Sequence, residues 1–269
     1  VVFEVDQYKV PIWNVHKEDL ELKSIHDAIR LQNRNTLILD KKANDIIEIS
    51  PKGRVSWRYV SDKNKKSELN QPSCVTVLDT NDLLVADTNN HRVMEMDLEG
   101  KILWQFGVTG SPGIEFNSLN HPTSIQKTMD ETYLVTDSGN NRLIEFTRKL
   151  NTESGFYETK VIWQYGNPEN LKGKGEGEEE DRLNKPVMAT KEQDGSYLIL
   201  DVGNKRAIEV TVDKKIIWTC KIEGEYSIPN PTRITRLKNK DILIVGDGKF
   251  IHIIPSADNR LVWASDVEE

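Results

Sequence analysis

Hydrophobic and polar residues alternate with a period of two along most of the chain, and clusters of turn residues separate the short apolar runs. This period is typical of half-buried β-strands, whose side chains point alternately to the two faces of a sheet. No stretch shows the 3.6-residue period of an amphipathic helix. Four of the apolar runs end in an aspartate, namely Asp40, Asp87, Asp137 and Asp201. The pattern predicts an all-β chain built from many short strands.

The tryptophans reveal an internal repeat. Each lies in the same kind of apolar segment, and successive tryptophans are 44, 47, 59, 55 and 45 residues apart. The six are Trp13, Trp57, Trp104, Trp163, Trp218 and Trp263. A repeat of this length with four strands is typical of a β-propeller blade. We expect each tryptophan to pack between neighbouring sheets.

A second marker stands nine residues before the tryptophan. In most repeats it is a glutamate in an apolar run. In the last repeat His252, 11 residues before Trp263, takes the place of the glutamate. The glutamates are Glu4, Glu48, Glu95 and Glu209, with Glu145 displaced by a nine-residue insertion. We expect their carboxylates to be solvated or hydrogen-bonded. The fixed phase predicts four strands per unit, called A to D, with the aspartate ending B, the glutamate in C and the tryptophan in D.

These markers predict a six-bladed β-propeller of four-stranded antiparallel blades with one blade incomplete. The chain is expected to form a single domain over residues 1–269. The predicted segments are a half blade, 1–15, and full blades 16–60, 61–108, 109–168, 169–222 and 223–269. The half blade holds only strands C and D. Its other strands could lie before Val1 or after Glu269, and an exposed edge there would invite pairing with a partner strand.

Two segments carry a resemblance to known repeats. LVADTNNHRVMEMDLEGKILWQFG and LVTDSGNNRLIEF resemble NHL repeats, and Asn90-His91-Arg92 is close to the turn that names them. The unit from His26 to Tyr59 also resembles propeller repeats of aryl-sulfate sulfotransferases. The spacing of Asp97, Gly100-Lys101 and Trp104 is similar to a motif of pyrroloquinoline-quinone dehydrogenases. These signatures imply the propeller fold, which hosts unrelated functions.

Composition narrows the range of functions. There are 36 basic and 43 acidic side chains, a net charge of −7, so a nucleic-acid partner is not expected. No apolar run reaches the roughly 20 residues of a membrane-spanning helix. No nucleotide-binding or nucleophile-elbow motif is present. Cys74 and Cys220 lie in different repeats outside any CxxC motif, so we expect two buried free thiols and no metal or cofactor.

The starts of the A strands are the candidate binding residues, because in propellers they line the mouth of the central channel. In four repeats a polar residue stands directly before a proline at this place. The polar residues are Gln71, His121, Lys185 and Asn230. They are expected to form a polar ring that binds a protein or a small ligand.

His26 and Asp27 occupy the same position in the second predicted blade and carry the alternative, an enzyme. The sulfotransferase resemblance implies a histidine that accepts a sulfuryl group as a nucleophile. Asp27 would orient the imidazole, and His121, Lys185 and Asn230 would hold the sulfate oxygens. That family has several His and Arg residues around its channel. Only two histidines and no arginine stand at matching positions here.

Two further enzyme classes fit less well. The peptide-amidating lyase is an NHL-type propeller whose zinc is held by three histidines. His16, His91 and His252 are out of phase with His26 and His121, so no third ligand is found. A quinone-linked dehydrogenase usually has eight blades, which disagrees with six tryptophans.

Two other features have a structural and a functional interpretation. The strand-B aspartate recurs with an arginine five residues later, as in Asp87 and Arg92, which indicates turn capping and an ion pair within a blade. The segment 171–184 is acidic and glycine-rich. It is expected to be a solvated loop, although a cation or a basic partner could bind Glu178, Glu179, Glu180 and Asp181.

The sequence therefore predicts a non-catalytic binding or scaffolding propeller. The partner is expected at the channel mouth, at the acidic loop or at the incomplete blade, within a longer secreted or surface polypeptide. The alternative is a sulfotransferase-like enzyme that uses His26.

Overall fold

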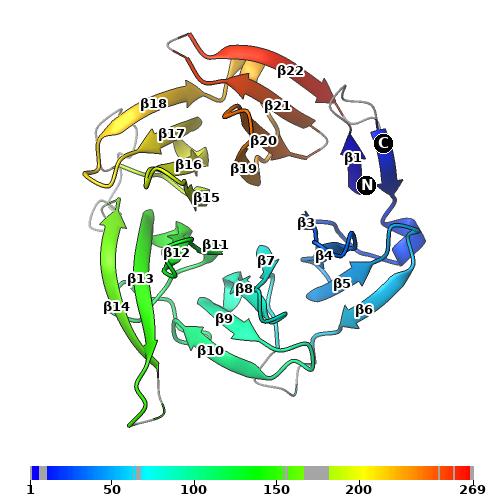
Figure 1. Cartoon of the computed structure of the whole chain (residues 1–269), viewed down its shortest axis with the longest axis vertical. Coiled ribbons are helices and arrows are strands. Elements are labelled where there is room, and N and C mark those ends of the chain that lie inside the picture. Colours follow the sequence, from blue (N-terminus) through cyan, green and yellow to red (C-terminus); the bar gives the residue numbers. More distant parts are fainter. Residues whose placement is uncertain are drawn as a thin grey trace. The chain divides into compact units, whose positions relative to one another are not determined.

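The computed structural model describes residues 2–5, 11–62, 64, 68–153, 155, 157–166, 182–247, 249–256 and 258–266. Their strands form five four-stranded antiparallel sheets and one two-stranded sheet (Figure 1). The all-β class and the four-stranded antiparallel blades of a β-propeller are confirmed. The predicted number of six blades is corrected to five, because the N-terminal segment supplies only two strands.

The structure divides into two compact units, Val1–Pro112 and Gly113–Glu269. The first unit contains the two-stranded sheet, blade 1 (β3–β6) and blade 2 (β7–β10). Its strands are β1 Val2–Val5, β2 Pro11–Val15, β3 Asp27–Arg30, β4 Thr36–Asp40, β5 Asp45–Ile49, β6 Val55–Tyr59, β7 Cys74–Val77, β8 Leu83–Asp87, β9 Arg92–Met96 and β10 Ile102–Phe106. Two short 3-10 helices, η1 Glu18–Leu20 and η2 Thr88–Asn90, lie between strands.

The second unit contains blade 3 (β11–β14), blade 4 (β15–β18) and blade 5 (β19–β22). Its strands are β11 Pro122–Lys127, β12 Tyr133–Asp137, β13 Arg142–Leu150, β14 Tyr157–Tyr165, β15 Pro186–Lys191, β16 Tyr197–Asp201, β17 Arg206–Val210, β18 Ile216–Lys221, β19 Arg233–Arg236, β20 Ile242–Gly246, β21 Lys249–Ile254 and β22 Arg260–Asp266. Its 3-10 helices are η3 Ser138–Asn140, η5 Val202–Asn204 and η6 Gly224–Tyr226. No helix among the described residues is long or apolar enough to cross a membrane.

The second strand is completely buried in four of the five blades. All five residues of β4, β8, β12 and β16 are buried. A strand has both faces covered only when its sheet is packed on both sides, so these strands lie inside stacks of sheets. Apolar clusters join blade 1 to blade 2, blade 3 to blade 4, and blade 4 to blade 5. Burial of this apolar surface is the main stabilising contribution to the stack.

The predicted glutamate and tryptophan markers are directly opposite each other in every sheet. Glu48 pairs with Trp57 in blade 1, and His252 pairs with Trp263 in blade 5. The two-stranded sheet has the same register, with Glu4 opposite Trp13. Each of these strand pairs also has a register shift beside the marker. The sheet β1–β2 therefore repeats the pairing of the two outer strands of a blade.

Tryptophan side chains connect successive sheets, as expected. The indole Nε1 of Trp13 donates to the carbonyl oxygen of Pro51, and that of Trp163 donates to the carbonyl oxygen of Val212, each at 2.9 Å. Trp218 donates to Oδ1 of Asn259 at 2.5 Å. Each acceptor lies in the turn between the two outer strands of the following blade. An indole packed between sheets needs such a partner for its N–H, so the geometry fixes how neighbouring blades are seated.

Three of the glutamate markers form ion pairs between sheets. A cation from the inner strand of the following blade reaches each of three glutamates. The pairs are Glu4–Arg30 at 2.5 Å, Glu145–Lys191 at 2.9 Å and Glu209–Arg236 at 2.7 Å. Their carboxylates are thus hydrogen-bonded, as expected. Where the glutamate is replaced, His252 Nε2 instead bonds to Asp241 Oδ2 of its own blade at 2.7 Å.

Candidate functional site

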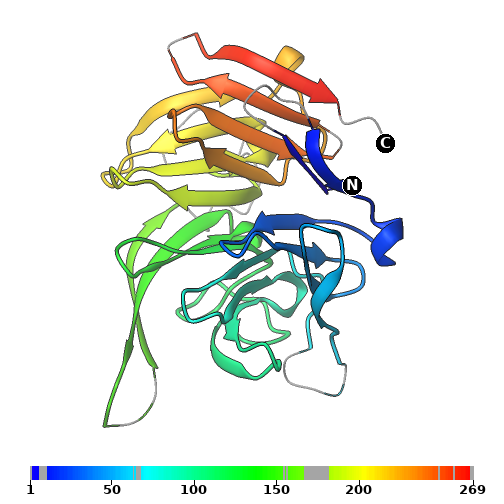
Figure 2. The same ribbon diagram turned by 45° about the vertical axis from the view of Figure 1, so that its right-hand side comes forward.

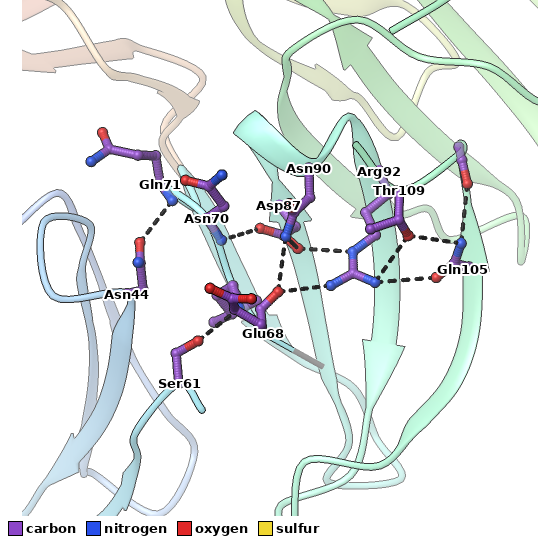
Figure 3. A network of polar contacts seen from close by, with 12 residues as sticks. Asn44, Ser61, Glu68, Asn70, Gln71, Asp87, Asn90, Arg92, Gln105 and Thr109 are labelled. Atoms are coloured by element: carbon purple, nitrogen blue, oxygen red, sulfur yellow. Dashed lines mark hydrogen bonds and ion pairs between the residues drawn. The ribbon is translucent and has the colours of Figure 1, made fainter. Parts of the chain in front are cut away.

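A buried clamp of three side chains joins strands B and C of blade 2 to the loop before strand A (Figure 3). Asp87 Oδ1 accepts the N–H of Asn70 at 2.7 Å. Its Oδ2 accepts from Asn90 Nδ2 and Arg92 Nε, both at 2.8 Å. Arg92 Nη2 in turn donates to the carbonyl oxygen of Glu68 at 2.9 Å. A buried ion pair is tolerated when its remaining polar atoms are bonded, and this pair meets that condition.

The same clamp recurs in blades 3 and 4. In blade 3, Arg142 Nε donates to Asp137 Oδ2 at 2.7 Å, and Arg142 Nη2 donates to the carbonyl oxygen of Ser118 at 3.1 Å. In blade 4, Arg206 Nε donates to Asp201 Oδ2 at 2.8 Å. The interpretation of the recurring Asp and Arg as turn-capping ion pairs is confirmed. The clamp is structural, and it determines what the adjoining loop presents.

The residue before strand A has an unusual backbone conformation in blades 3, 4 and 5. In blade 3 the clamp holds the N–H of Asn120 at 2.7 Å, and Gly139 N–H donates to the Asn120 carbonyl oxygen at 2.8 Å. The next residue, His121, is left-handed with φ of 47°. Lys185 and Asn230 have φ of 48° and 40°. A non-glycine residue in this region costs of order 1–3 kcal/mol and persists only where its surroundings determine it.

Three of the predicted binding residues lie at one end of the second unit. His121, Lys185 and Asn230 are exposed and precede the inner strands of blades 3, 4 and 5. The inner strands of blades 3 and 4 are neighbours, since Lys191 N–H donates to Gln126 Oε1 at 2.8 Å. His121, Lys185 and Asn230 therefore share one rim. The fourth predicted residue, Gln71, has the same left-handed turn, with φ of 52°, in the first unit.

Two asparagines each accept a hydrogen bond from a rim residue of the following blade. Asn141 Oδ1 in blade 3 accepts the N–H of Lys185 in blade 4 at 2.8 Å. Asn44 Oδ1 in blade 1 accepts the N–H of Gln71 in blade 2 at 2.7 Å. Both asparagines are themselves left-handed. The position of each of these two rim residues is thus fixed by its own blade and by the preceding one.

His121 and Asn230 are also held through their side chains. His121 Nδ1 donates to Asn120 Oδ1 at 2.8 Å, which orients the imidazole. Asn230 Nδ2 donates to Asp247 Oδ2 at 2.8 Å. Hydrogen bonds therefore fix the side chains of His121 and Asn230 on the rim.

A loop that the sequence reasoning missed lies beside this rim. Phe116 is 68% exposed and Ile114 is 41% exposed, although both are large apolar residues. The loop is fastened from behind, because Arg142 Nη1 donates to the Ile114 carbonyl oxygen at 3.1 Å and Asn140 Nδ2 donates to that of Gly113 at 2.8 Å. No hydrophobic periodicity marks this segment. Its only sequence signal is an aromatic residue between turn formers.

The alternative catalytic pair, His26 and Asp27, lies at the start of the inner strand of blade 1. His26 is half-buried, and its N–H donates to the Leu39 carbonyl oxygen at 3.0 Å. Asp27 Oδ1 accepts the N–H of Ala28 at 3.0 Å. The sulfuryl-accepting role of His26 stays a prediction. Within the part of the chain that the structure describes, no three His, Cys, Asp or Glu side chains are grouped to hold a metal ion.

Two other sequence-based predictions have different outcomes. Glu178, Glu179, Glu180 and Asp181 lie outside the described residues. Cys74 and Cys220 are buried free thiols, as expected. Burial raises the pKa of Cys220 to about 11. A thiol of this kind is a poor nucleophile, which fits a packing role.

Comparisons with known proteins agree with this geometry. Residues 69–94 match the model of the NHL repeat, and this segment contains the clamp residues Asp87, Asn90 and Arg92. A stretch of 45 residues is 47% identical to Protein brain tumor of Drosophila melanogaster. That stretch covers 17% of this chain and 4% of the length of that protein. The chain is a β-propeller in which one segment matches the NHL repeat.

Solved structures share the fold at low identity. A streptogramin B lyase has a TM-score of 0.59 and 19% identity, over 98% of this chain and 75% of that chain. A catalytically inactive virginiamycin B lyase from Staphylococcus aureus with quinupristin has a TM-score of 0.55 and 18% identity, over 91% and 70% of the two chains. Propellers of this kind carry different activities, so these likenesses concern the fold alone.

Proposed function

We propose that this chain is a non-catalytic binding module whose protein partner docks on the rim surface of blades 3 to 5, defined here as Ile114, Phe116, His121, Lys185 and Asn230. The observation that carries the proposal is Phe116, a largely exposed aromatic side chain on a loop fastened by Arg142 and Asn140. Aromatic residues held in place dominate the energy of many protein interfaces.

The chemistry of the surface indicates the kind of partner. Ile114 and Phe116 supply an apolar contact, while His121, Lys185 and Asn230 add donors around it. An apolar centre with a polar rim is typical of a protein-binding surface. The fixed loop reduces the entropy lost on binding. We therefore expect a folded protein with an apolar pocket beside carbonyl or carboxylate acceptors.

The test compares Phe116→Ala with Met129→Ala. Met129 is 79% exposed in the turn after β11, at the end of that strand opposite His121. A photo-crosslinking residue at position 116 would identify the partner, and binding of the purified partner would then be titrated. Phe116→Ala should weaken binding by about 30-fold, the effect of a hot-spot residue. Met129→Ala should leave affinity within about twofold. Equal effects of the two substitutions would reject the rim surface as the site.

We also propose that the two-stranded sheet binds a strand of a partner. β1 and β2 pair with the register of the outer strands of the five blades, with Glu4 opposite Trp13. Trp13 and Glu4 also contact blade 1 through Pro51 and Arg30. On this proposal β1 is the edge strand with which the partner strand pairs. Protection of the β1 amides from hydrogen exchange in the assembled protein would test it, and rapid exchange there would contradict it.

A further inference from the structure

The outer hairpin of blade 3 extends beyond its sheet. β13 and β14 each have nine residues, whereas β12 pairs with β13 only as far as Phe146. Residues Thr147–Leu150 pair with β14 alone among the described strands. Figure 2 shows this hairpin as a long arm (green). A two-stranded ribbon without a third strand is only marginally stable in water unless something else supports it.

One side chain supports the base of the arm. The Arg148 guanidinium lies 5.0 Å from the ring centroid of Tyr133 in β12 and 4.4 Å from that of Tyr157 in β14. Tyr133 stacks in turn on Phe146. These cation–π contacts join the arm to the blade, so β14 has a defined position.

β14 is an unusually long edge strand. It is the last strand in the order of its sheet, and the other outermost strands of blades have five to seven residues. An edge strand of this length offers a row of backbone donors and acceptors to another strand. The arm has an exposed apolar pair as well, since Leu150 and Tyr157 are opposite each other and 52% and 42% exposed.

We propose that β14 pairs antiparallel with β14 of a second copy of this chain, about a two-fold axis at Thr159. In this register Glu158 lies opposite the second copy's Lys160, and Lys160 lies opposite its Glu158. Tyr157 lies opposite Val161, and Thr159 lies opposite itself. Opposite charges, aromatic with β-branched residues, and Thr with Thr are all favourable cross-strand pairs. The strand is therefore complementary to itself, as a two-fold interface requires.

The charges select this register over its neighbours. Paired residues must share a face of the sheet, so the two-fold axis passes through a residue. Moving the axis to the next residue shifts the register by two residues. An axis at Glu158 places two glutamates opposite each other, and an axis at Lys160 does the same with two lysines. Like charges directly opposite are destabilising. Glu158 also accepts from Asn151 Nδ2 at 2.6 Å, which holds its carboxylate in place.

Charge reversals test the proposal on the full chain by sedimentation velocity at low ionic strength. Glu158→Lys and Lys160→Glu should each raise the dimer dissociation constant at least about tenfold, because both cross-strand pairs become repulsive. The double variant Glu158→Lys/Lys160→Glu restores opposite charges and should return to within about threefold of the wild type. Lys215→Glu, an exposed turn residue of the same unit, is the matched control and should leave the constant unchanged.

Mixing the two single variants sharpens the test. The Glu158→Lys chain carries lysine at both positions, and the Lys160→Glu chain carries glutamate at both, so each cross-strand pair between them is attractive. The mixture should therefore form heterodimers more readily than either variant forms homodimers. Thr159→Cys should form a disulfide-linked dimer on mild oxidation, because residues opposite each other in a sheet lie within disulfide reach. Ile162→Cys, also exposed on β14 but away from the axis, should not.

The outcomes are decisive in either direction. A dimer that the single reversals weaken and the double reversal restores establishes the β14 pairing. A chain that stays monomeric at its highest soluble concentration overturns it, and so does a dimer indifferent to all three charge variants. In those cases the charges on β14 serve only to discourage edge pairing. The dimer and the rim surface are tested by different variants. The charge reversals change β14, and Phe116→Ala changes the rim surface, so failure of one proposal does not imply failure of the other.

Discussion

Blade 3 and blade 1 anchor their inner strands in different ways. In blade 3, Arg142 pairs with the buried Asp137 and reaches back to the loop before β11. In blade 1, Asp45 stands at the position of the arginine, and the nearest cation is Arg58, 3.7 Å away. Asp40 accepts backbone N–H groups from the segment just before β3, without a cation.

The two blades thus hold the segment before their inner strand by different interactions. The segment before β3 carries Leu20 and Leu22, which are buried in an apolar cluster with Ile38 and Ile47. The loop before β11 buries Leu119 but exposes Ile114 and Phe116, and hydrogen bonds hold this exposed part. An apolar anchor buries the side chains of a loop. A polar clamp that binds the backbone carbonyl groups of the loop leaves its side chains exposed.

The largest expected effect comes from breaking the clamp. Arg142→Ala leaves Asp137 buried without its cation, which typically costs about 3–5 kcal/mol of stability. Arg58→Ala in blade 1 removes a longer and more exposed pair, so its cost should stay below about 1 kcal/mol. Urea denaturation of both variants measures the difference. Similar losses in the two blades would contradict the distinction between them.

A second prediction concerns Gly166, which directly follows β14 and lies against the backbone of Asn141 and Arg142. Gly166 has φ of +90°, and a Cβ there would lie 2.3 Å from the Asn141 carbonyl oxygen. Gly166→Ala should therefore cost about 2–4 kcal/mol. In blade 1 the same position is Val60, which is exposed. Gly195→Ala is the control, because its φ is +84° with open space around it, and it should cost about 1 kcal/mol. Thermal unfolding compares the two, and equal losses would show that the close approach is unimportant.

The smallest effect is a pH dependence in blade 1. Burial raises the pKa of Asp45 above its ordinary value of 3.8, and Arg58 only partly opposes this. The folded chain therefore holds this proton more tightly than the unfolded chain. The contribution to stability is present below pH 3.8 and is lost as the pH rises through the raised pKa.

Asp45→Asn should remove this loss. Between about pH 4 and pH 7 the variant should gain stability relative to the wild type, by less than about 1 kcal/mol. Chemical denaturation at several pH values measures the trend. A variant whose disadvantage grows with pH would show that the carboxylate of Asp45 is stabilised by Arg58 more than burial destabilises it.

Much of the fold could be predicted from the sequence because each marker residue of the repeat has the same structural role in every blade. Tryptophan, glutamate and the strand-B aspartate each recur at a fixed phase, and the structure pairs Glu48 with Trp57 as that phase implies. Asp87 and Arg92 could be identified as a pair because both recur together. The count of blades was wrong, since two strands at the N-terminus do not make a four-stranded sheet.

The site was less predictable because its geometry depends on distant residues. The left-handed backbone of His121 depends on Asp137, whose carboxylate bonds to Asn120 from 17 positions away. The exposure of Phe116 depends on Arg142, and no local pattern encodes it. The nine-residue insertion before Trp163 was visible, but periodicity does not say that it lengthens both strands of one hairpin.

The tryptophan contacts run in one direction along the chain. Trp13, Trp163 and Trp218 each bond to a turn that follows 38 to 49 residues later. During synthesis on the ribosome, the indole N–H of a new blade therefore bonds to water, and the surface that the next blade covers stays exposed until that blade has been translated. Each blade completes the one made before it, so translation pauses within a blade should expose the preceding tryptophan to chaperones.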